Sequence, residues 1–358
     1  MKKTIYVHIG SHKTGTTALQ SFFSLNRDIL KKNGYLYPGI WKAHHSIVRE
    51  LRDMNHVNHD AFQRSKLRKI LNEIENTRCQ TIVISSEAFF QFGCGIQLKK
   101  KIEQVLGNSV DIKILCYCRR QDHLLQSVYQ QIIKSPSKNP QKMPISAFVM
   151  DTNYLKKWDY FQKLKEWEEV FGREAIIIRV YEKNQFYQND LVRDFLHTIG
   201  LEFTSSYQIP TEKQSNIGLE PDAIELLRIV NVTIDDPKIK KYILNLIQDM
   251  NEKRIGETYS ILSPRERVNI IRFFEESNQS IARKYLGRED GKLFLESLPD
   301  PDEPWEPYEG LTIEKIVPVF IRMMFYLERE SEVQFKSLHP QNPTIPNLFR
   351  QFKEKIGF

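Results

Sequence analysis

The chain has 358 residues, 41% of them hydrophobic, and its 52 Lys and Arg outnumber its 45 Asp and Glu for a formal net charge of +7. This composition predicts a protein that folds independently around a sizeable core, as one large domain or two. The positive charge suits anionic ligands. Because the sequence has neither zinc-finger spacing nor an RNP-type aromatic motif, we expect no nucleic-acid partner.

Neither a secretion signal nor a membrane-spanning segment is evident in the sequence. The first apolar run is interrupted at His8 and ends well before the length of a signal-peptide core. The most apolar later stretch, residues 317–327, is too short to cross a bilayer and carries Arg322. The cysteines lack the spacing of a zinc site and are expected to be buried thiols in a reducing compartment. We therefore predict a cytoplasmic protein.

The first part of the chain alternates strand and helix patterns. Apolar runs rich in β-branched residues predict strands at 4–9, 81–85, 111–118 and 174–180. Helical periodicity predicts helices at 16–32, 60–76, 97–106, 122–134, 155–170 and 188–198. The alternation predicts a three-layer α/β/α fold with a mostly parallel central sheet, like that of P-loop NTPases. Phosphate groups should then lie beyond the carboxyl ends of the strands.

The strand pattern fades after residue 219. Helices are predicted at 219–231, 237–250, 264–285, 312–334 and 345–355. We therefore predict an α/β core over residues 1–218 and a helical C-terminal region over residues 219–358 that packs on the core.

Residues 4–20, TIYVHIGSHKTGTTALQ, combine a strand, a polar turn and the start of a helix. Gly10 and Gly15 allow the turn to fold back, and residues 14–17 place N–H groups and hydroxyls at the positive end of the helix. A phosphate is favoured at such an N-terminus, although an ordinary strand-to-helix turn is the alternative. The residues predicted to contact the phosphate are His12, Lys13, Thr14, Gly15, Thr16 and Thr17.

The same turn nearly matches the P-loop G-x-x-x-x-G-K-[ST], but Thr16 stands where that motif has Lys. The cation is instead Lys13, two residues before the second glycine. From there its ammonium reaches nearer the bridge between a phosphate and a transferred group. The pattern HKTGTT after a strand resembles the 5′-phosphosulfate loop of sulfotransferases that use 3′-phosphoadenosine 5′-phosphosulfate (PAPS).

A second polar turn follows the strand predicted at 111–118. Arg119 and Ser127 stand eight residues apart there, and a planar guanidinium with a hydroxyl suits phosphate oxygens. The spacing resembles the 3′-phosphate motif of the same family, which implies that these two residues hold the 3′-phosphate. For Arg120 and Asp122, a surface ion pair is an equal alternative.

Further segments resemble bacterial sulfotransferases of the carbohydrate-modifying kind, over roughly residues 4–295. They are ILKKNGYLYPG, VISSEAF, IIIRVYEKNQFYQNDLVRDFLHTIGL and IARKYLGREDGKLF. The resemblance implies PAPS as co-substrate, 3′-phosphoadenosine 5′-phosphate (PAP) as product and no metal requirement. It also implies in-line sulfuryl transfer to a hydroxyl or amine of an acceptor, expected to be a saccharide or glycolipid. The sequence does not identify the acceptor or the oligomeric state.

Sulfuryl transfer needs a cation for the leaving oxygen and a base for the acceptor proton. Lys13 is the expected cation. Glu87, at the end of the strand predicted at 81–85, and His45 are equal candidates for the base, with His44 as a further rival. The resemblance also implies that Lys213 and Asn216, just before the helix predicted at 219–231, contact the nucleotide, because related proteins bring a polar loop over it there.

Two other functions stay open at this point. One is a P-loop kinase or NTPase with a degenerate motif, and the other is a nucleotide-binding module without catalytic activity. Thr16 argues against the first, because the motif's Lys is missing. The strand predicted at 81–85 also leads into Ser86 and Glu87 rather than a metal-binding Asp.

Overall fold

A computed structural model describes residues 2–53, 59–135, 137, 140–210, 219–250, 260–321 and 324–325. The chain forms two compact units. The first comprises Met1–Val128, Ser146–Asn216 and Leu262–Pro304, and the second comprises Tyr129–Ile145, Ile217–Ile261 and Trp305–Phe358. Residues 262–304, which the sequence analysis assigned to the C-terminal region, therefore group with the sheet. The division of the chain at residue 218 stays a prediction.

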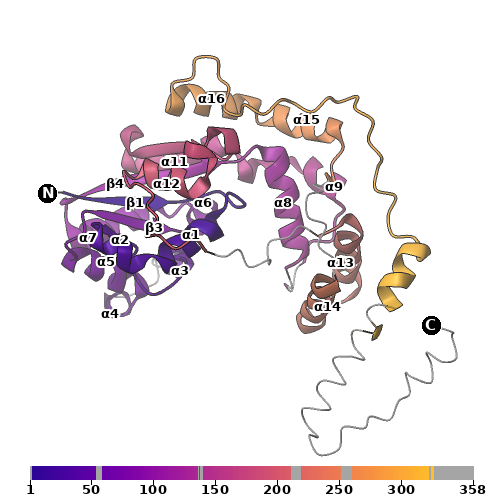
Figure 1. The fold of residues 1–358 in the computed structure, drawn as a ribbon, viewed down its shortest axis with the longest axis horizontal. Helices are drawn as coiled ribbons and strands as arrows, with labels where there is room; N and C mark the ends of the chain where they lie inside the picture. The colour runs from indigo at the N-terminus through magenta and orange to yellow at the C-terminus, as the bar shows by residue number, and fades with distance from the viewer. Residues whose placement is uncertain are drawn as a thin grey trace, which may run out of the picture. The chain divides into compact units, whose positions relative to one another are not determined.

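The first unit is built on a five-stranded sheet in the order β2-β3-β1-β4-β5, in which every pairing is parallel. Its strands are β1 (Lys3–His8), β2 (Tyr35–Leu36), β3 (Thr81–Ser85), β4 (Val110–Cys118) and β5 (Ile176–Val180). Four of these strands were predicted to within two residues, whereas β2 is too short to show an alternating pattern. Figure 1 shows β1, β3 and β4 side by side in the sheet.

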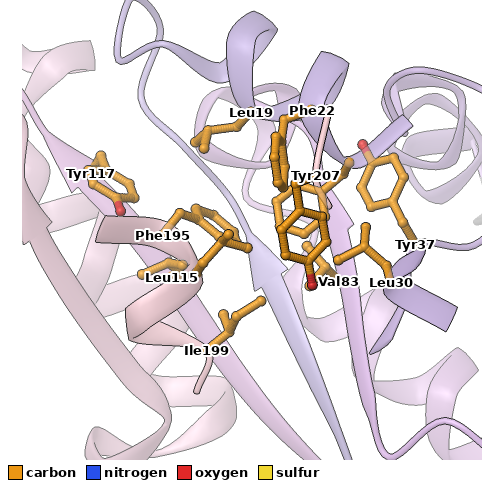
Figure 2. Close-up of a cluster of buried hydrophobic side chains, with 12 residues drawn as sticks. Leu19, Phe22, Leu30, Tyr37, Val83, Leu115, Tyr117, Phe195, Ile199 and Tyr207 are labelled. Carbon is orange, nitrogen blue, oxygen red and sulfur yellow. The ribbon is translucent and has the colours of Figure 1, made fainter. Parts of the chain in front are cut away.

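Helices cover both faces of this sheet, so the predicted three-layer α/β/α architecture is confirmed. On one face, side chains of α1, α2 and α12 pack over β1, β3 and β4. The resulting cluster includes Leu19, Phe22, Leu115 and Phe195 (Figure 2). On the other face, α11 packs against β4 and β5 and buries Trp167.

The helices of the first unit follow the alternation seen in the sequence. They are α1 (Thr16–Leu25), α2 (Arg27–Lys32), α3 (His45–Asp53), α4 (His59–Gln63), α5 (Lys66–Asn76), α6 (Ala88–Phe92), α7 (Gly95–Leu106), α8 (Gln121–Ile133), α9 (Ile145–Met150), α10 (Thr152–Leu155), α11 (Tyr160–Phe171), α12 (Leu191–Thr198), α15 (Pro264–Phe273) and α16 (Glu275–Leu286). Helices α8 and α9 extend across a boundary between the units. Short 3₁₀ turns lie at η2 (Lys156–Trp158), η3 (Arg173–Ala175), η4 (Lys183–Gln185) and η5 (Tyr187–Asn189).

The structure breaks two of the predicted helices. The helix expected at 16–32 divides at Asn26, whose side chain donates to the carbonyls of Phe22 and Gln208. The helix expected at 264–285 divides at Phe274 into α15 and α16. The expected helix at 155–170 is shorter because Asp159 caps the start of α11 by accepting from the Gln162 N–H. In the first and third cases a side-chain hydrogen bond, donated by Asn26 or accepted by Asp159, marks the break in a pattern that periodicity alone continues.

The described part of the second unit includes α13 (Pro221–Thr233), α14 (Pro237–Met250) and a helix at residues 313–321. Tyr308 donates to Asp222 of α13 over 2.7 Å. The helix expected at 345–355 lies outside the described residues, as does most of the second half of the one expected at 312–334. None of the helices in the described ranges is long and apolar enough to span a bilayer.

Candidate functional site

The loop between β1 and α1 has a backbone that needs glycine at two positions. Gly10 and Gly15 have φ of 37° and 71°, and a Cβ on Gly15 would collide with the Leu191 side chain. Lys13 also has positive φ, at 64°, which is uncommon for a residue with a side chain. The loop therefore reverses the direction of the chain sharply, and α1 begins directly after it at Thr16.

Buried hydroxyl groups hold this loop in place. The Ser11 hydroxyl donates to the Tyr117 carbonyl over 3.1 Å and lies 3.2 Å from the Tyr160 hydroxyl. The Thr14 hydroxyl donates to the Ser11 carbonyl over 2.7 Å and is fully buried. Thr14 is one of the predicted phosphate contacts, but its hydroxyl donates within the loop, so its backbone N–H is the group that remains for a ligand.

The N-terminus of α1 has no side-chain cap. Its first N–H groups, on Thr16 and Thr17, have no hydrogen-bond partner among the described residues. Thr17 is exposed, whereas Thr16 is largely buried. An uncapped helix N-terminus with free N–H groups is a favourable position for an anion.

The two predicted phosphate motifs meet at the end of the sheet. Arg119, which follows β4, donates through Nη1 to the Lys13 carbonyl over 2.9 Å. Its guanidinium lies 5.6 Å from the centre of the Tyr181 ring, and its backbone N–H donates to the Tyr160 hydroxyl. Burial and, second, the nearby Arg119 charge lower the pKa of Lys13 below its usual value, against the opposing effect of Glu87. Two cations separated by 106 residues in sequence thus share one site.

Ser127 lies on α8, eight residues after Arg119, and is partly exposed. No hydrogen bond joins its hydroxyl to Arg119 or to the loop in the part of the chain that the structure describes. Its role therefore stays a prediction from the spacing.

A carboxylate and an imidazole lie together beyond β3. Glu87 accepts from Gln20 Nε2 at Oε2 over 3.1 Å, and its Oε1 lies 3.7 Å from His45 Nε2. The other ring nitrogen of His45, Nδ1, lies 2.8 Å from the Ser86 hydroxyl. The side chains of His45 and Glu87 are 47% and 19% exposed, so solvent reaches both.

His44 has a structural environment that removes it from the candidate bases. It is fully buried, with Nε2 2.9 Å from the Pro38 carbonyl and Nδ1 accepting from the Ser85 N–H over 3.0 Å. Burial lowers the pKa of His44 to about 4. Both nitrogens are thus occupied, and the ring is neutral near pH 7.

His12 precedes Lys13 in the loop and contacts an aromatic side chain. Its ring meets Trp158 edge-on at 5.7 Å, and its pKa is lowered mainly by burial, with Glu87 opposing the shift. No group of three or more His, Cys, Asp and Glu side chains is arranged to hold a metal ion in the ranges described. Lys213 and Asn216 lie outside the described residues.

The surface ion pair considered for Arg120 and Asp122 is wrong, because both side chains are buried. Arg120 Nε donates to Asp122 over 2.8 Å, and Arg267 of α15 contacts the same carboxylate over 2.8 Å. Burial alone would raise the pKa of Asp122, but the hydrogen bond from Arg120 and the surrounding positive charges hold it below its usual value. Arg120 is therefore structural, whereas its neighbour Arg119 faces the loop.

Sequence reasoning missed His8 and Gln20. His8 is fully buried with Nδ1 2.9 Å from the Ser85 hydroxyl, and Gln20 is 3% exposed on α1. For Gln20 the sequence offers one signal. It is a polar residue on the face of the predicted helix where the period places apolar residues, next to Leu19 and before Phe23. That signal shows an unusual buried group but not its partner, which the fold brings from β3.

No family model matches the sequence. The chain is 31% identical over 212 residues to an uncharacterized protein of Archaeoglobus fulgidus, an alignment that covers 58% of this chain. The chain spans about half of that relative, 54% of its length. A solved sulfotransferase from Alicyclobacillus acidocaldarius shares 14% identity and a TM-score of 0.34, over 68% of this chain and 96% of its own.

Proposed function

We propose that this protein is a PAPS-dependent sulfotransferase that transfers the sulfuryl group to a hydroxyl of a saccharide or glycolipid. The observation that carries the proposal is the convergence of an uncapped helix N-terminus, two cations and a carboxylate at the carboxyl ends of β1, β3 and β4. The connections that leave the neighbouring strands β1 and β3 run toward opposite edges of the sheet, and ligands bind at such switch points in parallel sheets. An amine acceptor is the variant of the same reaction.

The donor nucleotide would lie along the loop and the turn after β4. In this proposal, the N–H groups of Thr16 and Thr17 bind the 5′-phosphosulfate together with Lys13, and Arg119 with Ser127 binds the 3′-phosphate. The contact between Arg119 and the Lys13 carbonyl supports this division, because it ties the two phosphate subsites together. Lys213 and Asn216 remain predicted contacts of the nucleotide.

The transfer itself would be an in-line displacement. The acceptor oxygen forms a bond to sulfur while the bond from sulfur to the 5′-phosphate oxygen breaks, and the electron pair of that bond stays with PAP. Lys13 is proposed to stabilise the charge that develops on the leaving oxygen. The acceptor proton passes to a carboxylate or imidazole beside the site.

The surroundings of Glu87 and His45 favour Glu87 as the base. A carboxylate offers about four lone-pair sites and Gln20 takes one of those on Glu87, whereas the Ser86 hydroxyl takes Nδ1 of His45 and leaves that ring only Nε2. Glu87 has one oxygen held by Gln20 and the other directed to a side chain at 3.7 Å, a distance that leaves its lone pairs open. After Glu87 has taken the proton, His45 is the neighbouring side chain that accepts a hydrogen bond or the proton from it.

Ligand binding and turnover test this function. We expect PAP to bind in a calorimeter in buffer containing EDTA, and labelled PAPS to transfer sulfate to at least one member of a saccharide and glycolipid panel. Magnesium-dependent binding of ATP without binding of PAP would instead identify a kinase or NTPase. Binding of PAP with no transfer to any acceptor, or to water, would identify a binding module.

A further inference from the structure

Gln20 is a buried amide in the helix that starts at the proposed phosphate site. It lies in the first two turns of α1, and its side chain is 3% exposed. Its Nε2 donates to two oxygens of β3 and the turn after it, Glu87 Oε2 over 3.1 Å and Ser85 Oγ over 3.3 Å. A buried amide is stable only when such partners satisfy it, so this orientation is strongly defined.

A second buried group fixes the direction of these hydrogen bonds. Ser85 Oγ also lies 2.9 Å from Nδ1 of His8. The His8 ring has no exposed surface, and burial lowers its pKa to about 4. Because Ser85 accepts from Gln20, its own proton is free to reach Nδ1 of the neutral His8 ring. An ionised carboxylate only accepts, so the amide must turn its nitrogen toward Glu87.

We infer that Gln20 is a positioning residue for Glu87. Its amide holds Oε2, which leaves Oε1 facing His45 at 3.7 Å. The buried pair of His8 and Ser85 keeps the amide from rotating. This inference rests on the proposed function, in which Glu87 accepts the acceptor proton.

Other groups also influence the ionisation of Glu87 and must stay unchanged in a test. Those that face it are His45 of α3, Lys13 and His12 of the loop, His8 of β1 and the buried Tyr37. A substitution at Gln20 alters none of these charges. It removes one hydrogen bond donated to Glu87 and a second donated to the uncharged Ser85 hydroxyl.

The test compares the wild type with Gln20→Met, which keeps the length of the side chain but removes the donor. The titration of the Glu87 carboxyl carbon is followed by ¹³C NMR, and the resonance is assigned by its loss in Glu87→Gln. We expect the midpoint to move to higher pH by about one unit, because a hydrogen bond to a charged group contributes on the order of a tenfold or greater preference. Ser21→Ala, on the same helix, is the matched control and should leave the midpoint unchanged.

Turnover supplies the second readout. In Gln20→Met, kcat should fall by about tenfold to a hundredfold and the acidic limb of the pH–rate profile should move upward with the NMR midpoint, while PAP affinity stays within about twofold. Gln20→Leu should behave in the same way, which separates the loss of the donor from a packing defect. An unchanged midpoint in a folded Gln20→Met protein would overturn the inference. A shifted midpoint in a protein that never turns over PAPS would instead overturn the proposed function and leave the contact standing.

Discussion

Replacement of Lys13 by Ala tests the central electrostatic claim. Within the described part of the chain, the Lys13 ammonium has no ion-pair partner, and its neighbour Arg119 carries the same charge. It is therefore available to a ligand. Two unit charges 4 Å apart interact by about 4 kcal/mol at an effective dielectric constant of about 20. With roughly half a charge on the leaving oxygen, the attraction between that oxygen and the Lys13 ammonium is about 2 kcal/mol. The hydrogen bond from the ammonium to the same oxygen adds to this, so that its removal is expected to lower kcat by about 10²–10³-fold.

The assay for Lys13→Ala combines single-turnover transfer of labelled sulfate with calorimetry of PAP. We expect kcat to fall by about 10²–10³ while PAP affinity changes little, because the charge acts mainly in the transition state. The control Lys32→Ala removes an equal charge from an exposed position at the end of α2. If Lys13→Ala retained full turnover, the role assigned to this lysine would be refuted. A loss of PAP affinity as large as the loss of kcat would show that the lysine serves ground-state binding instead.

Three further predictions concern the rest of the site. Arg119→Ala and Ser127→Ala should weaken PAP far more than 5′-AMP in calorimetry, and equal losses for both ligands would contradict a 3′-phosphate site. Glu87→Gln should lower kcat by about 10²–10⁴ and His45→Gln much less, and the reverse order would transfer the role of base to the histidine. Folding stability should fall as the pH drops from about 6.5 to 4. In this range His44 takes up a proton in the unfolded chain, whereas in the folded protein burial lowers its pKa to about 4 and keeps the ring neutral. Urea denaturation at both ends of that range should show a loss to which His44 and the equally buried His8 each contribute about 3 kcal/mol, and His44→Asn should remove the share of His44.

Local patterns in the sequence account for most of the sheet and the loop. Residues 82–84 of β3 and 114–118 of β4 are buried and largely apolar on both faces, a property of central parallel strands that needs no knowledge of their partners. Gly10 and Gly15 indicated a reversal because few other residues adopt positive φ. Patterns of this kind do not show where a helix breaks. The predicted helix divides into α1 and α2 at Asn26, whose side chain donates to the Gln208 carbonyl, 182 residues away in the sequence.

The sequence by itself determined the parallel α/β architecture, the turn before α1 and the identity of the charged residues that follow three strands. Only the tertiary structure decided which of them meet. It brought Arg119 to the Lys13 carbonyl, buried Arg120 and Asp122, and joined Gln20 to Glu87. The physical reason is that strand propensity and turn geometry depend on neighbours in the chain, whereas burial and hydrogen bonding depend on residues that only the order of strands in the sheet brings within about 3 Å.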